Sequence, residues 1–226
     1  MNQTLEQNDN PLAMTIVVKD TKDFTVTQLA ETVAIAVASF TPVSYVDAPD
    51  NWKEWNETNF RKILKRMKPN QFDKIAEKAP ETIDKYFHRS GTGNVEVVVF
   101  EPLRKSEKIE ALKTAQVSHF TTVDEELSSV TKFGVPVVTL NKDLNMSAGK
   151  ASVAAAHALQ KLREHMFVND SLSFQMWEAH KRIHVRWDSI DENDDSIIVI
   201  HDSGFTEVVP GSITAVAEMK GSPFLR

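Results

Sequence analysis

The feature that most constrains the fold is an apolar run followed by a polar loop and an alanine-rich segment in the second half of the chain. Residues 135–140 (VPVVTL) have the length of a buried strand, with the proline near the start, where a strand best accommodates it. Residues 151–159 are rich in alanine, a strong helix former. Ser147, Gly149 and Lys150 therefore stand at a helix N-terminus, where free N–H groups and the helix dipole favour an anion. This order predicts an α/β fold with a lysine placed to meet a phosphate or an oxyanion.

Composition restricts the chemistry that this chain can perform. None of its 226 residues is a cysteine, which excludes disulfides, thiolate metal sites and a cysteine nucleophile. The seven histidines are scattered and form no HExxH motif, so we expect no metal and no cofactor. No apolar run approaches the roughly 20 residues of a membrane span, which predicts a cytoplasmic protein without a membrane partner. A net charge of −6 argues against a generally basic nucleic-acid binder, and we expect no DNA partner.

The first half begins with a similar order of elements. Residues 1–11 are polar and predict a disordered leader. Residues 12–19 (LAMTIVVK) predict a strand, and residues 26–40 (VTQLAETVAIAVASF) predict an apolar helix. Further along, residues 95–100 (VEVVVF) predict a buried strand, and residues 105–116 predict a helix. The opening of the chain thus repeats the strand, loop and helix order of the second half.

Two amphipathic helices are predicted between these elements, at residues 52–67 and 71–88. Five of the eight residues 61–68 (RKILKRMK) are basic and none is acidic. A charge run of this kind is usual on a solvated helix face. The alternative is a patch that contacts phosphate groups, formed by Arg61, Lys62, Lys65 and Arg66.

Two blocks of the second half resemble the peptidyl-tRNA hydrolase 2 family. The first block is similar to the family's D-L-x-M-x-x-G-K loop and alanine-rich helix ending A-H-A, and it matches at Asp143, Leu144, Met146, Gly149, Lys150, Ala156, His157 and Ala158. The second is similar to the family's I-x-D-A-G-R-T-Q-I-x-P-G-S-x-T-V-x-A, and it matches at Ile200, Asp202, Gly204, Thr206, Pro210, Gly211, Ser212, Thr214, Val216 and Ala217. Between the blocks, residues 182–187 lie where the family has its second strand.

The resemblance implies a mixed, roughly four-stranded sheet with helices on both faces, and hydrolysis of the ester that joins a peptide to the 3′ ribose of tRNA. The catalytic residues that it implies are Lys150, Asp202, Thr206 and Thr214. Lys150 would hold a phosphate or the oxyanion, Asp202 would orient or deprotonate water, and the threonines would donate hydroxyl hydrogen bonds. Substrate-binding residues would be Ser147, Gly149, His157 and Gly204, together with the basic run. Lys150 and Asp202 should then lie within hydrogen-bonding reach of each other.

Three positions depart from the family's pattern. Phe205 replaces an arginine, Glu207 replaces a glutamine, and Ala154 replaces a helix glutamine. The first two changes weaken the attraction to a polyanion. Residues 188–196 are also too few for the family's second helix. The alternative function is therefore a catalytically inactive module that binds RNA or a protein partner.

The first half resembles the same family more faintly. Residues 95–121 follow the family's pattern of second strand, helix and third strand, while residues 16–36 resemble its first strand and helix, with Gln28 in place of Lys150. This suggests a degenerate duplicated unit at residues 12–134, with a helical insertion at residues 41–93, ahead of the unit at residues 135–226. A homodimer is compatible with this organisation.

The candidate residues also have ordinary structural explanations. A lysine at position 150 can also belong to a solvated loop, and a histidine at position 157 can also be buried and hydrogen-bonded without a catalytic role. Asp202, which precedes Ser203 and Gly204, is typical of a residue that closes a turn. The positions of these three side chains decide between the two interpretations.

Overall fold

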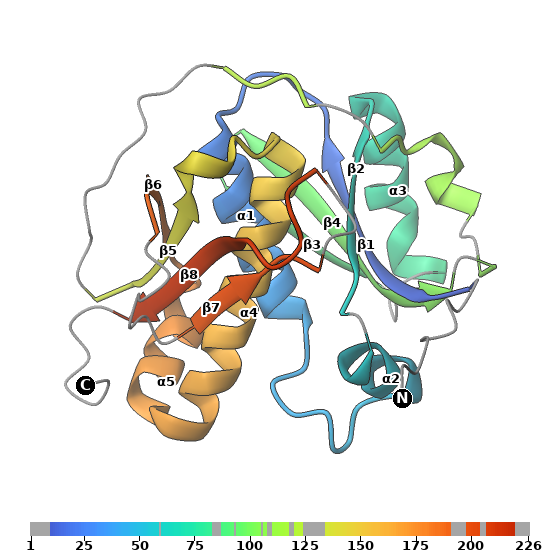
Figure 1. Ribbon diagram of the computed structural model, residues 1–226. Helices are drawn as coiled ribbons and strands as arrows, with labels where there is room; N and C mark the ends of the chain where they lie inside the picture. Colours follow the sequence, from blue (N-terminus) through green and yellow to red (C-terminus); the bar gives the residue numbers. More distant parts are fainter. Residues whose placement is uncertain are drawn as a thin grey trace, which may run out of the picture.

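The computed structural model of the chain contains two four-stranded sheets with the same strand order (Figure 1). The first sheet runs in the order β2 (Lys62–Met67), β1 (Leu12–Lys19), β4 (Val95–Arg104), β3 (Phe87–Thr92). The second runs in the order β6 (His184–Asp188), β5 (Pro136–Asn141), β8 (Ile213–Met219), β7 (Ile198–His201). The structure describes residues 10–58, 60–82, 87–92, 94–104, 106–107, 110–117, 120–123, 134–190, 198–203 and 207–219.

Strand directions repeat along with strand order. In the first sheet β1 is parallel to β2 and antiparallel to β4, which is antiparallel to β3. In the second sheet β5 is parallel to β6 and antiparallel to β8, which is antiparallel to β7. The predicted α/β class with a mixed, roughly four-stranded sheet is confirmed, and it occurs in two units.

Helices α1 (Val26–Phe40) and α4 (Ala148–Asn169) lie between the two sheets and pack against each other (Figure 1). Both carry many small buried side chains, which allow close approach of the two helices. Each also contacts the edge strand of the other unit, α1 with β6 and α4 with β2. One hydrophobic core therefore contains residues of both halves.

The remaining helices cover the ends and the outside. Helix α2 (Asp50–Glu57) and helix α5 (Ser171–His180) lie at the lower end of the view in Figure 1. Helix α3 (Pro69–Thr82) packs on the outer face of the first sheet, where a second core cluster joins Phe72 and Ile75 to Val17, Val98 and Phe100. The first sheet thus has helices on both faces. Two short 3₁₀ turns are η1 (Glu110–Thr114) and η2 (Lys142–Leu144).

A constant sequence offset relates equivalent residues of the two units. The same number of positions separates the helix N-caps Thr25 and Ser147, the buried tryptophans Trp55 and Trp177, and the first residues of β2 and β6, which are Lys62 and His184. All four tryptophans are buried. None of the helices in the described part of the chain has the length and hydropathy that crossing a bilayer requires.

The prediction of a helix at residues 52–67 is wrong beyond α2. Residues 62–67 form β2, which pairs in parallel with β1 from Met14 to Lys19. Lysine, arginine, leucine and methionine favour a helix, but the pairing with a buried neighbouring strand overrides that local preference. The helix predicted at residues 71–88 likewise ends with α3, and β3 follows it.

These strands also correct the proposed helical insertion at residues 41–93. That segment contains β2 and β3, which are half of the first sheet. The second strand of the first unit is therefore β2, whereas the run at residues 95–100 belongs to β4. The helix predicted at residues 105–116 is reduced to η1 among the described residues. The leader predicted at residues 1–11 lies almost wholly outside the described residues.

Candidate functional site

Lys150 and Asp202 come from opposite ends of the second unit's chain. Lys150 is the third residue of α4, and the N-cap Ser147 accepts a hydrogen bond from its backbone N–H at 3.2 Å. Asp202 follows β7 directly and is held by two backbone hydrogen bonds: its N–H donates to the Ser212 carbonyl at 2.9 Å, and its own carbonyl accepts from Gly211 N–H at 2.8 Å. Gly211 has φ +85°, a conformation that favours glycine, so the P-G-S turn fixes the position of Asp202.

The two side chains meet. Lys150 Nζ lies 2.5 Å from Asp202 Oδ1, and the exposed fractions of the two side chains are 14% and 4%. The predicted convergence is therefore confirmed. A charge-assisted hydrogen bond between largely buried groups is stronger than one in open water. The arrangement places a carboxylate that can accept a proton beside a cation that can stabilise negative charge.

Thr214 is buried on β8 and its hydroxyl already has a partner. Its side chain donates to the Ile200 carbonyl across the β7–β8 pair at 3.2 Å, and the residue is 2% exposed. The hydroxyl oxygen retains lone pairs but its proton is used within the sheet. Thr206 and Gly204 lie outside the described residues, so two of the predicted site residues have no described position.

The N-terminus of α4 receives an acidic side chain from the same unit. Ser147 N–H donates to Glu207 Oε1 at 2.7 Å. A Cβ added to Gly149 would lie 3.6 Å from the ring of Phe120, which belongs to the first half of the chain. Sequence comparison identified Glu207 only as a departure from the family, and nothing in the sequence linked Phe120 to this helix. A carboxylate thus occupies part of the position where an anionic substrate was expected.

His157 faces the first unit. Its Nδ1 lies 3.0 Å from Lys62 Nζ on β2, and its ring packs 5.6 Å from that of Phe60. Lys62 Nζ also lies 4.2 Å from the centroid of Phe60 and 4.9 Å from that of Trp55. Burial lowers the pKa of Lys62 well below its ordinary value, despite the opposing charge of Glu164. Burial, followed by the charges of Lys62, Lys150 and Lys161, also lowers the pKa of His157.

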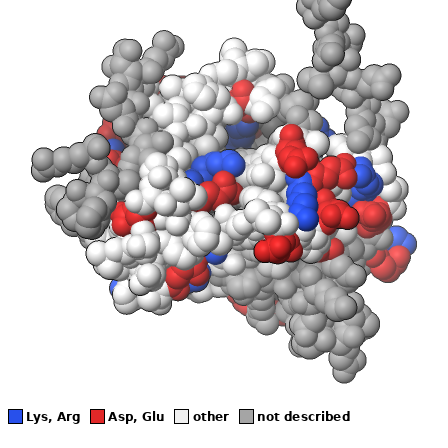
Figure 2. Space-filling model, turned by 90° about the horizontal axis from the view of Figure 1, so that it is seen from below, with Lys and Arg blue, Asp and Glu red and all other residues white. Residues whose placement is uncertain are grey.

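The predicted basic patch is divided between two faces of β2. Lys62 points inward to His157, while Arg61 and Lys65 line a pocket on the outer face. Arg66 donates to Asp20 at 2.7 Å and to Gln116 at 3.4 Å. In the view of Figure 2, the described lysine and arginine side chains are interspersed with aspartate and glutamate, and they form no continuous basic surface on that face.

A scan against models of protein families gives no match, and a search of solved structures gives none either. Within the described residues, no group of three or more histidine, aspartate or glutamate side chains is arranged to hold a metal ion. The interpretation of the site rests on its own geometry and on the two sequence blocks.

Proposed function

We propose that this chain hydrolyses the ester bond between a peptide and the 3′ ribose of tRNA. The observation that carries the proposal is the contact of Lys150 Nζ with Asp202 Oδ1 at 2.5 Å, at the N-terminus of α4. Both residues belong to the sequence blocks that resemble the peptidyl-tRNA hydrolase 2 family, and they come together from separate elements. A cytoplasmic location, where tRNA is charged and used, is part of the proposal, whereas a homodimer is not needed for it.

In the proposed reaction, a water molecule attacks the carbonyl carbon of the ester. Asp202 accepts a proton from that water, and Lys150 stabilises the negative charge that develops on the carbonyl oxygen. The bond from the carbonyl carbon to the ribose 3′ oxygen then breaks, and the leaving oxygen takes the proton that Asp202 accepted, which restores the carboxylate. The products are a free carboxylic acid and a tRNA with a 3′ hydroxyl. No cofactor enters these steps.

The direct test is release of a blocked amino acid from tRNA by the purified full-length chain. We expect Lys150→Ala and Asp202→Asn each to lower the rate of ester hydrolysis about 100-fold, the size usual for the loss of a general base or an oxyanion donor. Lys142→Ala is the matched control, since Lys142 precedes the same helix but lies 3.7 Å from Asp188 and is about half exposed.

The controls decide between a specific and an unspecific result. Lys142→Ala should leave the rate unchanged, and circular dichroism should show that all variants remain folded. An absence of hydrolysis by the unaltered chain, or equal losses in Lys142→Ala and Lys150→Ala, would rule the proposal out.

One contact favours the second candidate, an inactive module that binds RNA or a protein partner. The Glu207 carboxylate accepts the Ser147 N–H at 2.7 Å, at the helix end where a substrate anion would be bound. In such a module the ion pair of Lys150 and Asp202 would serve stability alone. Measurement of tRNA affinity at increasing salt separates the candidates, because several phosphate contacts would make the affinity fall steeply with salt. Turnover by the purified chain would exclude the inactive module.

A further inference from the structure

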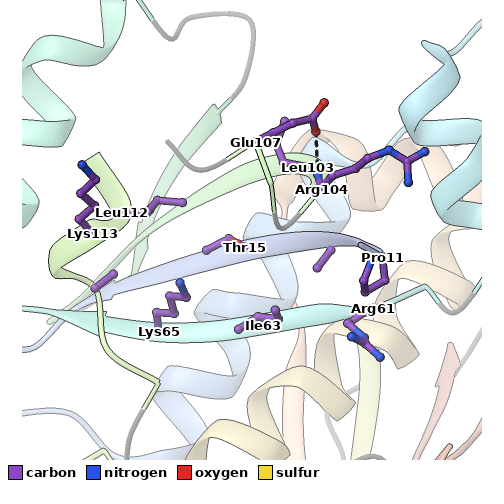
Figure 3. A pocket seen from close by; sticks show the side chains of 12 residues that line it. Pro11, Thr15, Arg61, Ile63, Lys65, Leu103, Arg104, Glu107, Leu112 and Lys113 are labelled. Atoms are coloured by element: carbon purple, nitrogen blue, oxygen red, sulfur yellow. Dashed lines mark hydrogen bonds between the residues drawn. The ribbon is translucent and has the colours of Figure 1, made fainter. Parts of the chain in front are cut away.

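A pocket on the outer face of the first sheet has no part in the proposed hydrolysis. It has a volume of about 430 Å³ and is lined by residues of β1, β2, β4 and the segment around η1 (Figure 3). That volume falls within the range of roughly 300–1,000 Å³ that is usual for small-molecule sites. Its residues are Pro11, Ala13, Thr15, Arg61, Ile63, Lys65, Leu103, Arg104, Glu107, Leu112, Lys113 and Ala115.

The floor of this pocket is aliphatic. Ala13 and Thr15 of β1, Ile63 of β2 and Leu103 of β4 lie on the face of the sheet opposite the main core, because side chains alternate along each strand. Leu112 and Ala115 close one end and pack against the cluster beneath α3. None of the lining residues is aromatic, so the pocket offers no ring on which a nucleobase could stack.

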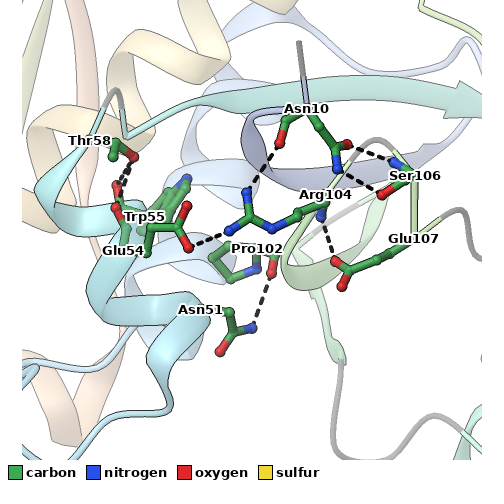
Figure 4. Close-up of polar contacts among 9 residues, drawn as sticks. All are labelled: Asn10, Asn51, Glu54, Trp55, Thr58, Pro102, Arg104, Ser106 and Glu107. Atoms are coloured by element: carbon green, nitrogen blue, oxygen red, sulfur yellow. Dashed lines mark hydrogen bonds and ion pairs between the residues drawn. The ribbon is translucent and has the colours of Figure 1, made fainter. Parts of the chain in front are cut away.

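One end of the pocket is held in place by a network around Arg104 (Figure 4). The Arg104 guanidinium donates to the Glu54 carboxylate at 2.5 Å and to the Asn10 carbonyl at 3.2 Å. Its backbone N–H donates to Glu107 Oε2 at 2.7 Å. The Arg104 guanidinium is thereby paired with Glu54, and the Glu107 carboxylate is held by the Arg104 backbone, so the two side chains form one wall of the pocket.

Two further cations, Arg61 and Lys65, line the pocket beside β2, and Lys65 belongs to the strand itself. Among the residues that the structure describes, its ammonium group has no hydrogen-bond or ion-pair partner, and the residue is half-buried on β2. In Figure 3 its side chain extends over the floor in the direction of Thr15, whose hydroxyl belongs to the same lining. Lys113, by contrast, pairs with Glu110 at 2.5 Å. An unpaired ammonium beside aliphatic walls favours a ligand that brings one negative charge.

We propose that this pocket binds a small anion with an aliphatic body, whose charged group pairs with Lys65 and contacts Thr15. Decanoate is a suitable probe, because it combines a single carboxylate with an unbranched chain. Decanol has the same chain without the charge. The ligand class follows from the lining: the floor takes the aliphatic body, and Lys65 takes the anionic group.

The experiment is calorimetric titration of the full-length chain with decanoate and with decanol. We expect saturable binding of decanoate at one site per chain and clearly weaker binding of decanol. Lys65→Met should weaken decanoate binding about tenfold or more, since a hydrogen bond to a charged group is lost. Lys68→Met is the matched control, because Lys68 is an exposed lysine that follows β2 and lies outside the lining.

Each outcome bears on the proposal. Unchanged affinity in Lys68→Met, together with the loss in Lys65→Met, supports it, provided that the two variants have the same melting temperature. The proposal fails if decanoate does not saturate, if decanol binds as tightly as decanoate, or if both variants lose the same affinity. None of these measurements involves tRNA, so the result is independent of the proposed hydrolase activity.

Discussion

The two units share a topology but use the start of their central helix differently. In the first unit, Gln28 is the third residue of α1 and accepts the Thr25 N–H at 2.9 Å, while Thr25 Oγ1 accepts the Gln28 N–H at 3.1 Å. In the second unit the same position holds Lys150, which pairs with Asp202. One unit closes its helix end with a neutral capping box, and the other places a charged pair there.

The connection between the last two strands also differs between the two units. In the first unit β3 ends at Thr92 and β4 begins at Val95, which is a short hairpin. In the second unit β7 ends at His201 and β8 begins at Ile213, and Asp202 lies at the start of this longer connection. Both units thus need the sheet and the helices for folding. The helix start and the connection between the last two strands differ, and in the second unit they hold the candidate catalytic residues.

Asp202→Ala should have the largest effect of the variants that distinguish the two units. It leaves the largely buried Lys150 ammonium without its carboxylate, so we expect the free energy of unfolding to fall by roughly 3 kcal/mol. Urea denaturation followed by circular dichroism measures the change. Thr92→Ala, at the end of the corresponding strand of the first unit, is the control, and a loss of equal size there would refute the distinction between the units.

Lys62→Met replaces a buried amine at the contact between the units with an apolar side chain. The pKa of Lys62 is lowered in the folded chain, so the unfolded chain binds more protons below the ordinary lysine pKa, and stability due to this group rises with pH. We expect the variant to be more stable than the unaltered chain at neutral pH, by about 1 kcal/mol. The advantage should shrink as the pH rises toward 10.5.

Denaturation measured across pH tests this expectation, with Lys68→Met as the control. The pKa of His157 is lowered too, so stability due to His157 is lost as the pH falls through its ordinary value of 6.5. An advantage of Lys62→Met that does not depend on pH would contradict the lowered pKa of Lys62.

Gln28→Ala tests the role of the helix start in the first unit. It removes one half of the capping box, so we expect the free energy of unfolding to fall by about 1 kcal/mol without any effect on ester hydrolysis. Thermal unfolding and the hydrolysis assay on the same sample measure both. A loss of hydrolysis would show that the helix start of the first unit also takes part in the proposed reaction.

Glu207→Gln should have the smallest effect of these variants. The amide oxygen can still accept the Ser147 N–H, so stability should change by less than about 0.5 kcal/mol. The loss of a negative charge at the N-terminus of α4 should raise the affinity for tRNA about twofold to threefold at low salt. Filter binding at two salt concentrations measures it. An unchanged affinity at low salt would mean that tRNA does not approach this helix end.

The second unit was predictable because its local signals agree with its fold. The apolar run of β5, the alanine-rich α4 and the alternation of β6 each indicate the element that forms. The contact of Lys150 with Asp202 was predictable from the two sequence blocks, and periodicity alone gave no sign of it. The distance between the residues along the chain carries no information about their distance in space.

The first unit was harder because tertiary contacts outweigh its local signals. The segment KILKRM becomes β2 only because β1 provides a parallel partner. The burial of Lys62 depends on α4, which crosses from the other unit and brings His157 to it. Glu207 at the helix start and Phe120 beside Gly149 likewise meet their partners through the fold, so no pattern within either segment could reveal these contacts.

The packing of α1 against α4 has a consequence for how the molecule comes apart. Because the two helices form one core, separating the units would expose the small-residue faces of both to water. We therefore expect a single cooperative unfolding transition and no stable fragment made of residues 135–226 alone. The first unit has no lysine and aspartate pair at its helix start, and we expect it to stabilise the second unit by covering the small-residue face of α4.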